Sequence, residues 1–209
     1  MSSADVVVSV PALEFVRGRP RLASGFSAEH AGLRRYGGLA AVAAVPPGRA
    51  GRRVQYWSFA GIADESHRDA IRGLPVSYDL TVIPPRPMGW ERPKTHGHIH
   101  TSRGTPETGF PELYEVLQGH AGFLVQDLHA GPSATFSALI EATSGETVVI
   151  PSLLHHVTIN LGEGVLVVAD VVCRACDDDY SQLRAAHGMA YFISIDNEAM
   201  PNPAYAAVP

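Results

Sequence analysis

Short apolar runs separated by prolines and glycines are the main pattern of this 209-residue chain. The runs are rich in β-branched residues and are bounded by turn formers, which is typical of β-strands. The expected strands are Val6–Val10, Leu39–Val45, Val54–Phe59, Val76–Ile83, Leu113–Leu117, Gly122–Val125, Thr135–Ile140, Thr147–Ile150, His156–Leu161 and Val165–Val172. So many short strands predict an all-β fold, either a sandwich or a barrel.

Signals for helices are few. Ser27 is a candidate N-cap for a helix over Ala28–Tyr36, and Asp64 is a candidate cap for a short helix that ends at Arg72. A third helix is expected over Asp178–Ala186, because a glycine follows it directly. The pattern therefore predicts strands as the framework, with a few short helices between them.

The strand pattern is loose in the first third of the chain and compact afterwards. We expect an N-terminal, strand-bearing extension over residues 1–75 that packs on the main unit or on a dimer partner. Residues 76–195 are expected to form the compact unit, and residues 196–209 a flexible C-terminal tail. The length agrees with one ordinary domain and an added terminal segment.

The composition excludes several classes of function. With 16 basic and 21 acidic residues the formal net charge is −5, which argues against nucleic acid or an anionic membrane as the main partner. No apolar run approaches the ~20 residues that span a bilayer. The N-terminus lacks the basic start and apolar stretch of a secretory signal, so we expect a soluble, cytoplasmic protein. Two cysteines, Cys173 and Cys176, are too few for a disulfide framework or a four-thiolate zinc site.

Histidines are densest in the segment from Lys94 to His100, which reads Lys-Thr-His-Gly-His-Ile-His. On a strand, residues i and i+2 share a face, so His98 and His100 would point the same way and could clamp a metal ion. The alternative is that they are polar residues on a solvated strand face. Lys94 is the only lysine of the chain, and its place beside this cluster hints at a function.

Two later segments carry further residues that could join the histidine pair in binding a metal ion. Glu112 is followed, after six residues, by Gly119, and His156 lies in a segment that runs from Gly145 through Pro151 to Asn160. Together the three segments resemble the two metal-binding motifs of the cupin superfamily, with Leu153 at a position where glycine is usual. The resemblance implies a double-stranded β-helix, or jelly-roll barrel. It also implies one divalent transition metal, Fe, Mn, Ni or Zn, whose ligands are His98, His100, Glu112 and His156.

A narrower resemblance covers roughly residues 76–182. The segments 78–85, 94–100, 112–114 and 119–126 are similar to the cupin-type phosphoglucose isomerase family. This family is usually homodimeric and interconverts glucose 6-phosphate and fructose 6-phosphate. The resemblance implies a small-molecule substrate, a sugar phosphate or related polyol. The substrate-binding residues that we expect are Thr81, Lys94, Thr95, Gly97 and Tyr180, with Glu112 and Tyr114 as catalytic residues.

The chemistry of these residue types agrees with an isomerase. Three imidazoles and one carboxylate suit Fe(II), Mn, Ni or Zn, and the remaining coordination positions could take two neighbouring sugar oxygens. Isomerisation through a cis-enediol moves a proton between two adjacent carbons and needs a base near both. Glu112 is the base that the family suggests, with Tyr114 positioning oxygens or relaying a proton. A metal-assisted hydride shift would need no such base.

One departure from the family lies between the first two motif segments. Eleven residues separate His100 from Glu112, and residues 102–110 are expected to form a Gly- and Pro-rich loop at the mouth of the barrel. Glu107 in this loop is an alternative ligand, but only Glu112 keeps the usual spacing to Gly119.

A second departure concerns the phosphate. Val172 and Asp178 stand where the family places a tyrosine and a histidine on the phosphate group. The acidic triplet 177–179 would repel a phosphate, unless it caps the following helix and faces water. Phosphate could then still rest on Thr81, Thr95, Lys94 and an arginine such as Arg92 or Arg103.

Three functions follow in order of preference. The first is an aldose–ketose isomerase that acts on glucose 6-phosphate or a close relative. The second is a member of the same family with an unphosphorylated substrate, as isomerase or as metal-dependent oxygenase. The third, a non-catalytic cupin that serves as a binding module, is disfavoured because all four ligand positions are filled.

Overall fold

Antiparallel strands make up the framework of the molecule. The computed structural model describes residues 10–103, 105–128 and 131–209. The strands are β1 Leu13–Val16, β2 Arg19–Leu22, β3 Phe26–Ser27, β4 His30–Arg35, β5 Val54–Ala60, β6 Ala63–Asp64, β7 Val76–Ile83, β8 Ile99–Ser102, β9 Thr105–Gly109, β10 Glu112–Gln118, β11 His120–Gln126, β12 Ser137–Thr143, β13 Thr147–Ile150, β14 His155–Asn160, β15 Leu166–Cys173, β16 Cys176–Asp179, β17 Tyr191–Ile193 and β18 Ala199–Pro201. The helices are α1 Arg68–Arg72, α2 Ser181–Ala185 and the 3₁₀-helices η1 Tyr36–Val42 and η2 Gly48–Arg52. The predicted all-β class is confirmed.

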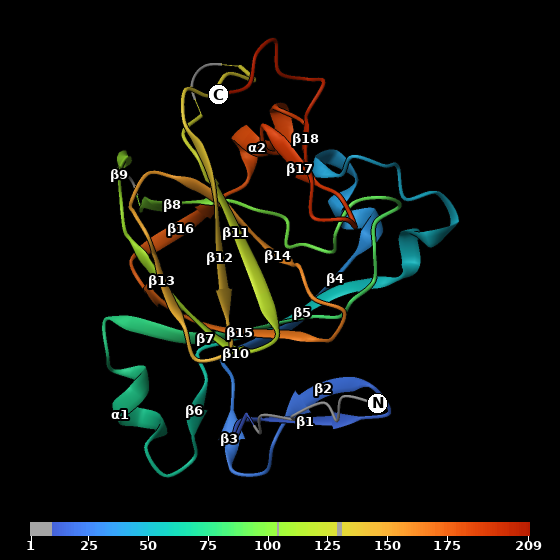
Figure 1. Cartoon of the computed structure of the whole chain (residues 1–209). Helices are drawn as coiled ribbons and strands as arrows, with labels where there is room; N and C mark the ends of the chain where they lie inside the picture. The colour runs from blue at the N-terminus through green and yellow to red at the C-terminus, as the bar shows by residue number, and fades with distance from the viewer. Residues whose placement is uncertain (1–9, 104, 129–130) are drawn as a thin grey trace.

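Two walls enclose the interior of the barrel. One wall is a six-stranded sheet in the order β13-β10-β15-β7-β5-β4, and the other is formed by the sheets β12-β11-β14 and β16-β8-β9 (Figure 1). Isolated β-bridges, Lys94 to Ile159 and His98 to His156, tie the segment before β8 to β14. Because β8 and β14 are joined in this way, side chains from both can reach the same point of the interior.

The central strands of the six-stranded sheet are buried on both faces. Leu166 and Val168 of β15 belong to the core between the two walls, whereas Val167 and Ala169 pack outward. The elements β1, β2, β3, β6 and α1 lie below this sheet in Figure 1 and cover its outer face. Burial on both faces explains the continuous apolar run of β15, whose residues alternate between the two sides as expected.

The N-terminal third of the chain contributes strands to the barrel wall. β5 pairs with β7, with Trp57 opposite Val82, and β4 pairs with β5 at the edge of the same sheet. The sheet therefore extends across residue 75, where the sequence predicted the boundary of an N-terminal extension. The three-part division of the chain stays a prediction.

Two local predictions in this part of the chain are wrong. The expected helix over Ala28–Tyr36 is instead mostly the strand β4, because pairing with β5 overrides a weak helical pattern. The expected strand over Leu39–Val45 is mostly the 3₁₀-helix η1, which buries Leu39 and Val42 completely or nearly so. A short apolar run does not distinguish a buried strand from a buried helical turn.

Other elements differ from the prediction in their limits. The helices α1 and α2 are shorter than expected, and Asp178 lies in strand β16 rather than in a helix. The loop expected over residues 102–110 contains strand β9. Its last residue, Gly109, is so close to β8 that an added Cβ would lie 2.5 Å from the carbonyl oxygen of His100. The expected strand Val6–Val10 lies almost entirely outside the described residues.

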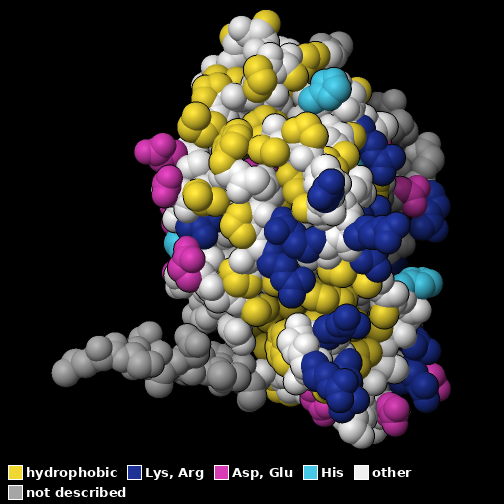
Figure 2. Space-filling view, turned by 90° about the vertical axis from the view of Figure 1, so that its right-hand side faces the viewer, with side chains coloured by type: hydrophobic (Ala, Val, Ile, Leu, Met, Phe, Trp, Pro, Cys, Tyr) yellow, Lys and Arg dark blue, Asp and Glu magenta, His cyan; other side chains and the backbone are white. Residues whose placement is uncertain are grey.

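The surface is not uniformly acidic. On the face drawn in Figure 2, basic side chains gather across the middle of the molecule, with hydrophobic side chains above and below them. Among the described residues, no helix is both long and apolar enough to cross a membrane.

Candidate metal centre

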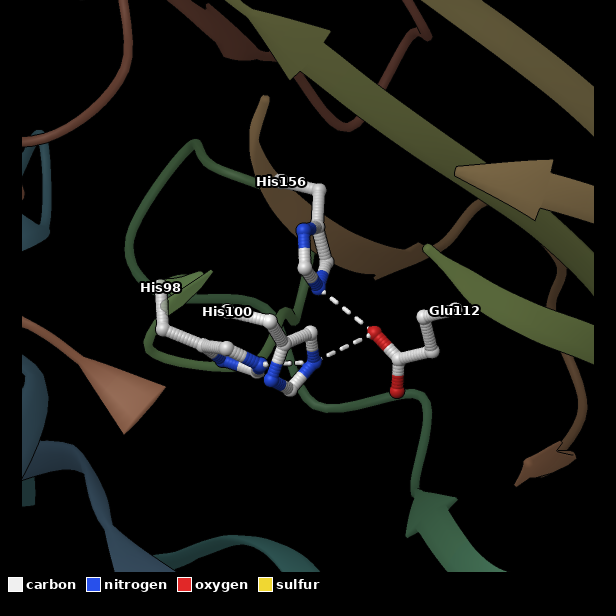
Figure 3. Close-up of side chains that lie close together, drawn as sticks. All are labelled: His98, His100, Glu112 and His156. Carbon is white, nitrogen blue, oxygen red and sulfur yellow. Dashed lines mark hydrogen bonds and ion pairs between the residues drawn. The ribbon is translucent and has the colours of Figure 1, made fainter. Parts of the chain in front are cut away.

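Four side chains from three parts of the barrel meet at one point of the interior. His98 directly precedes β8, His100 lies in β8, Glu112 opens β10, and His156 lies in β14 (Figure 3). Their ligand atoms all lie within 4.8 Å of one another. Nε2 of His100 and Nε2 of His156 are each 2.8 Å from Oε2 of Glu112, and Nε2 of His98 is 3.1 Å from Nε2 of His100. Residues that are up to 58 positions apart in sequence thus form one compact donor set.

The strand registers explain this convergence. His98 and His156 face each other in a β-bridge, with reciprocal backbone hydrogen bonds of 3.1 and 2.9 Å. His100 follows at i+2 on the same strand face, as predicted, and the side chains of His100, Glu112 and His156 are buried. The geometry therefore depends on backbone pairing and not on flexible side chains alone.

The donor set fits a divalent transition-metal ion. Nδ1 of His156 faces the carbonyl oxygen of Leu154 at 3.3 Å, which leaves the buried Nε2 directed at Oε2 of Glu112, at 2.8 Å. A cation could be shared between this nitrogen and the carboxylate. Three imidazole nitrogens and one carboxylate oxygen are the ligands that Fe, Mn, Ni and Zn accept. One such metal is the cofactor that these residues would hold.

Burial and hydrogen bonding set the charges of the four groups in the metal-free chain. Burial lowers the pKa of His98 to about 3, so this ring is neutral at pH 7. Burial also lowers the pKa of His100, but hydrogen bonds to acceptors that include Asp178 and Glu112 outweigh it and raise that pKa to about 12. Burial raises the pKa of Glu112, and hydrogen bonds from His100 and His156 outweigh it and lower that pKa below the ordinary value. A cation would replace the proton on His100, since metal binding displaces protons from its ligands.

A cavity of about 450 Å³ opens beside the four side chains. Of the residues that the resemblance implied, Thr81, Thr95, Gly97, Tyr114 and Tyr180 all line it. Val172 and Asp178, which stand at the family's phosphate positions, line it as well.

Lys94 does not line the cavity, although the sequence suggested it as a substrate-binding residue. Its ammonium group forms a buried ion pair with Glu91, donates to the carbonyl oxygen of Val42 at 2.7 Å and lies 4.9 Å from the ring centre of Phe192. The side chain therefore has a structural role, joining the segment before β8 to η1. The two arginines suggested for the phosphate, Arg92 and Arg103, pair with Glu163 and Asp177 and are also absent from the lining.

Several residues that line the cavity were not predicted from the sequence. Arg34 of β4 and Tyr56 of β5 come from the part of the chain for which no resemblance was recognised. Asp79 and Asp170, which face each other on β7 and β15, lie on the inner face of the sheet. Burial raises the pKa of Asp170 well above its ordinary value, and the charge of Glu112 adds to this. A carboxyl group within the apolar run of β15 was the available signal.

Two further histidines, His96 and His155, lie next to the four candidate ligands without being among them. His96 is buried, and its Nε2 accepts from Arg184 at 3.3 Å, so it lies beside the cavity without joining the donor set. His155 points to the opposite strand face and is buried, which agrees with packing. Burial lowers the pKa of His155 to about 4. The side chain of Glu107, the alternative ligand, lies outside what the structure describes.

Comparison with solved structures finds cupin barrels of low similarity. An oxalate decarboxylase variant from Bacillus subtilis is 16% identical over 58% of this chain and 26% of that chain, with a TM-score of 0.41. The formate complex of the Lactobacillus farciminis oxalate decarboxylase is 21% identical over 60% and 30% of the two chains, with a TM-score of 0.42. A cupin 2 conserved barrel domain protein from Rhodopseudomonas palustris is 18% identical over 58% and 63%, with a TM-score of 0.38. The chain spans less than a third of the two decarboxylases.

Comparison of the sequence with protein families identifies the family of the chain, which the solved structures do not. No curated protein sequence matches the chain. The family model described as "Glucose-6-phosphate isomerase (GPI)" matches residues 34–209. The match begins well before residue 76 and includes the end of β4, η1 and β5. This match covers most of the chain and both motif segments that carry the donor set. The chain belongs to the glucose-6-phosphate isomerase family of the cupin type.

Proposed function

We propose that this protein is a metal-dependent isomerase that interconverts an aldose and a ketose, with glucose 6-phosphate or a close sugar phosphate as substrate. The observation that carries the proposal is the convergence of His98, His100, Glu112 and His156 at the edge of a cavity of about 450 Å³. The family match supports the reaction type. The cavity size falls in the range of small-molecule sites, about 300–1,000 Å³.

The proposed roles follow from which atoms are already engaged. A bound divalent metal would act as a Lewis acid on the carbonyl and hydroxyl oxygens of the substrate. Oε2 of Glu112 contacts both His100 and His156, whereas Oε1 contacts neither ring and is directed away from them (Figure 3). Oε1 is therefore the atom that we propose takes the proton from one carbon and returns it to the next, through a cis-enediol. Tyr114, buried beside Glu112, would orient the reacting oxygens.

Arg34 is the proposed partner of an anionic group on the substrate. Among the described residues, Arg34 is the one Lys or Arg side chain that lines the cavity. No carboxylate group of the described residues lies within 4.0 Å of the Arg34 guanidinium. Its guanidinium donates a hydrogen bond to the hydroxyl of Tyr56, at 3.4 Å, and not to a carboxylate. A phosphate beside Arg34 would supply the missing counter-charge. Thr81 and Thr95 would add hydroxyl groups to the lining of the cavity.

A second candidate is an unphosphorylated substrate in the same cavity. The observation that favours it is the acidic lining, in which Asp79, Asp170 and Asp178 accompany Glu112. These carboxyl groups suit hydroxyl groups of a polyol better than they suit a second anion. In this case the reaction would be isomerisation of a free sugar, or an oxygenation that requires Fe(II).

An anaerobic isomerase assay tests the proposal. Metal-depleted protein is incubated with glucose 6-phosphate, fructose 6-phosphate or the free sugars, with and without added Mn²⁺, Fe²⁺, Ni²⁺ or Zn²⁺. We expect conversion of a sugar phosphate that requires added metal, is lost in His156→Ala and is retained in His120→Ala, a surface histidine paired with Glu141. Conversion of free sugars alone would favour the second candidate. Failure to isomerise either class would contradict the isomerase, as would oxygen consumption that depends on substrate in a parallel incubation under air. The same preparations test the homodimer expected from the family through their mass in solution.

A further inference from the structure

The ring of His100 is held from both sides. Its Nε2 faces the carboxylate of Glu112 at 2.8 Å, on the side of the metal centre. Its Nδ1 faces Oδ1 of Asp178 at 3.2 Å and Sγ of Cys176 at 3.4 Å. His100 and Asp178 are directly opposite each other in the pairing of β8 with β16, so the backbone fixes this approach. None of the comparisons assigns a role to Asp178.

The two nitrogens of a neutral imidazole have different functions. One carries the proton and the other carries the lone pair, so only the second can bind a metal ion. An acceptor at Nδ1 draws the proton to that atom, which leaves the lone pair of Nε2 for the metal and also fixes the plane of the ring. We propose that Asp178 is a positioning residue of the metal centre, which holds His100 in the tautomer and orientation that present Nε2 to the cation.

Asp178 is itself held in place. The hydroxyl of Tyr180 donates to Oδ2 of Asp178 at 2.9 Å, which leaves Oδ1 for His100. The Tyr180 ring packs edge-on against His96, with 5.0 Å between the ring centres, and lies at the start of α2. One carboxylate oxygen is therefore directed at His100 by a chain of contacts that reaches the helix.

This arrangement differs from that of the neighbouring ligand. Nδ1 of His156 faces a backbone carbonyl oxygen, that of Leu154, which no substitution removes. The acceptor at His100 is a side chain, so its contribution can be measured by mutation. The proposal also gives Asp178 a role other than the repulsion of phosphate, because its charge is shared with His100 and Tyr180.

The decisive measurement is metal affinity rather than activity. Zn²⁺ or Mn²⁺ binding to the metal-depleted full-length protein is followed by titration calorimetry. For Asp178→Ala we expect an affinity about 10–100-fold weaker, the usual effect of removing the acceptor behind a ligand histidine. Asp178→Asn keeps an acceptor oxygen, so its metal affinity should fall less than that of Asp178→Ala. Asp177→Ala is the matched control, because Asp177 lies on the same strand but pairs with Arg103 at the surface.

A second measurement needs no variant and remains available if Asp178→Ala does not fold. In the zinc-loaded protein, a long-range proton–nitrogen NMR spectrum distinguishes the protonated ring nitrogen of each histidine from the one that binds the metal. We expect protonated Nδ1 in His100. Metal bound through Nδ1, or equal affinities for Asp178→Ala and Asp177→Ala, would overturn the proposal.

A competing arrangement is a second cation held by His100, Cys176 and Asp178, whose ligand atoms also lie within 4.8 Å of one another. It predicts two metal equivalents per chain, one of them lost in Cys176→Ser. Our proposal predicts one equivalent, unchanged by that substitution, and two equivalents would contradict it. All of these outcomes concern metal binding, so they are independent of whether the substrate is a sugar phosphate.

Discussion

Two cavities of about 450 Å³ lie on opposite faces of the six-stranded sheet, and their linings share Leu80 but otherwise differ. The inner cavity is lined by histidines, carboxyl groups and tyrosines, whereas the outer one is lined almost entirely by apolar side chains from β3, β6, α1 and the chain before β1. β7 contributes to both, with Asp79 and Thr81 on the inner side and Tyr78 on the outer side. The period of two along one strand thus places polar side chains on the side of the candidate metal centre and mostly apolar ones on the other side.

The two linings imply different consequences of mutation. Charged and polar groups inside the barrel have a free-energy cost of burial that a bound cation and hydrogen bonds offset. The outer cavity has Asp64 as its one acidic lining residue and otherwise belongs to the apolar cluster that packs the N-terminal elements onto the sheet. We therefore expect substitutions on the inner side to act mainly on metal binding, and substitutions on the outer side to act mainly on the free energy of unfolding.

The largest effect is expected from removing a metal ligand. His156→Ala should weaken metal affinity by more than the roughly 10–100-fold that loss of a supporting partner costs, because a direct bond to the cation disappears. Elemental analysis after dialysis should find metal in the wild-type protein and none in the variant. His120→Ala should keep the metal. Full metal occupancy in His156→Ala would remove this residue from the site and would end the distinction between the two cavities.

The next effect is expected on the outer side. Ile62 is 4% exposed and lines the outer cavity, so Ile62→Ala should lower the free energy of unfolding by about 2–5 kcal/mol. Denaturant titration measures this, with Val149→Ala as control, since Val149 is 60% exposed and should change stability by no more than about 0.5 kcal/mol. The metal affinity of Ile62→Ala should equal that of the wild type. If Ile62→Ala lost as much metal affinity as His156→Ala, the inner and outer sides of the sheet would be coupled.

The sequence predicted the inner side better than the outer side, for a physical reason. Strand alternation predicts that His98 and His100 share one face, and the motif resemblance added Glu112 and His156. The structure brings the ligand atoms of these four residues within 4.8 Å of one another. Lys94 does not line the inner cavity, and a rare charged residue beside a site can equally be a buried ion-pair partner, here of Glu91.

What the sequence could not predict depends on contacts distant along the chain. Nothing in the local pattern of β4 shows that it will pair with β5 and bring Arg34 to the cavity. The position of Asp178 beside His100 follows from the register of β16 with β8, which cannot be read from the acidic triplet itself. Side chains that complete a site from a remote strand become visible only once the pairing is known.

The smallest effect concerns a buried carboxyl group on the inner side. Burial raises the pKa of Asp79 above its ordinary value, although hydrogen bonds from Ser77 and the backbone amide of Gly61 partly oppose it. Since the folded state then binds the proton more tightly than the unfolded state, the ionised group destabilises the fold above the folded pKa, and the penalty disappears as the pH falls below the unfolded value. Asp79→Asn should therefore raise Tm at pH 7 by no more than about 2–4 °C, the equivalent of ~1 kcal/mol.

Thermal unfolding of metal-free Asp79→Asn and wild-type protein from pH 7 to pH 4 measures this difference. The gain in Tm should shrink as the pH falls, because the wild-type carboxyl group becomes protonated in the folded state first. Asp177→Asn is the matched control, since its carboxylate lies at the surface and pairs with Arg103, and it should show no such convergence. A gain that persists at pH 4 would mean that ionisation of Asp79 is not its cause, and a loss at pH 7 would mean that Asp79 is stabilised as an anion. The inner cavity would then tolerate negative charge without a cation, and its contrast with the outer cavity would rest on the histidines alone.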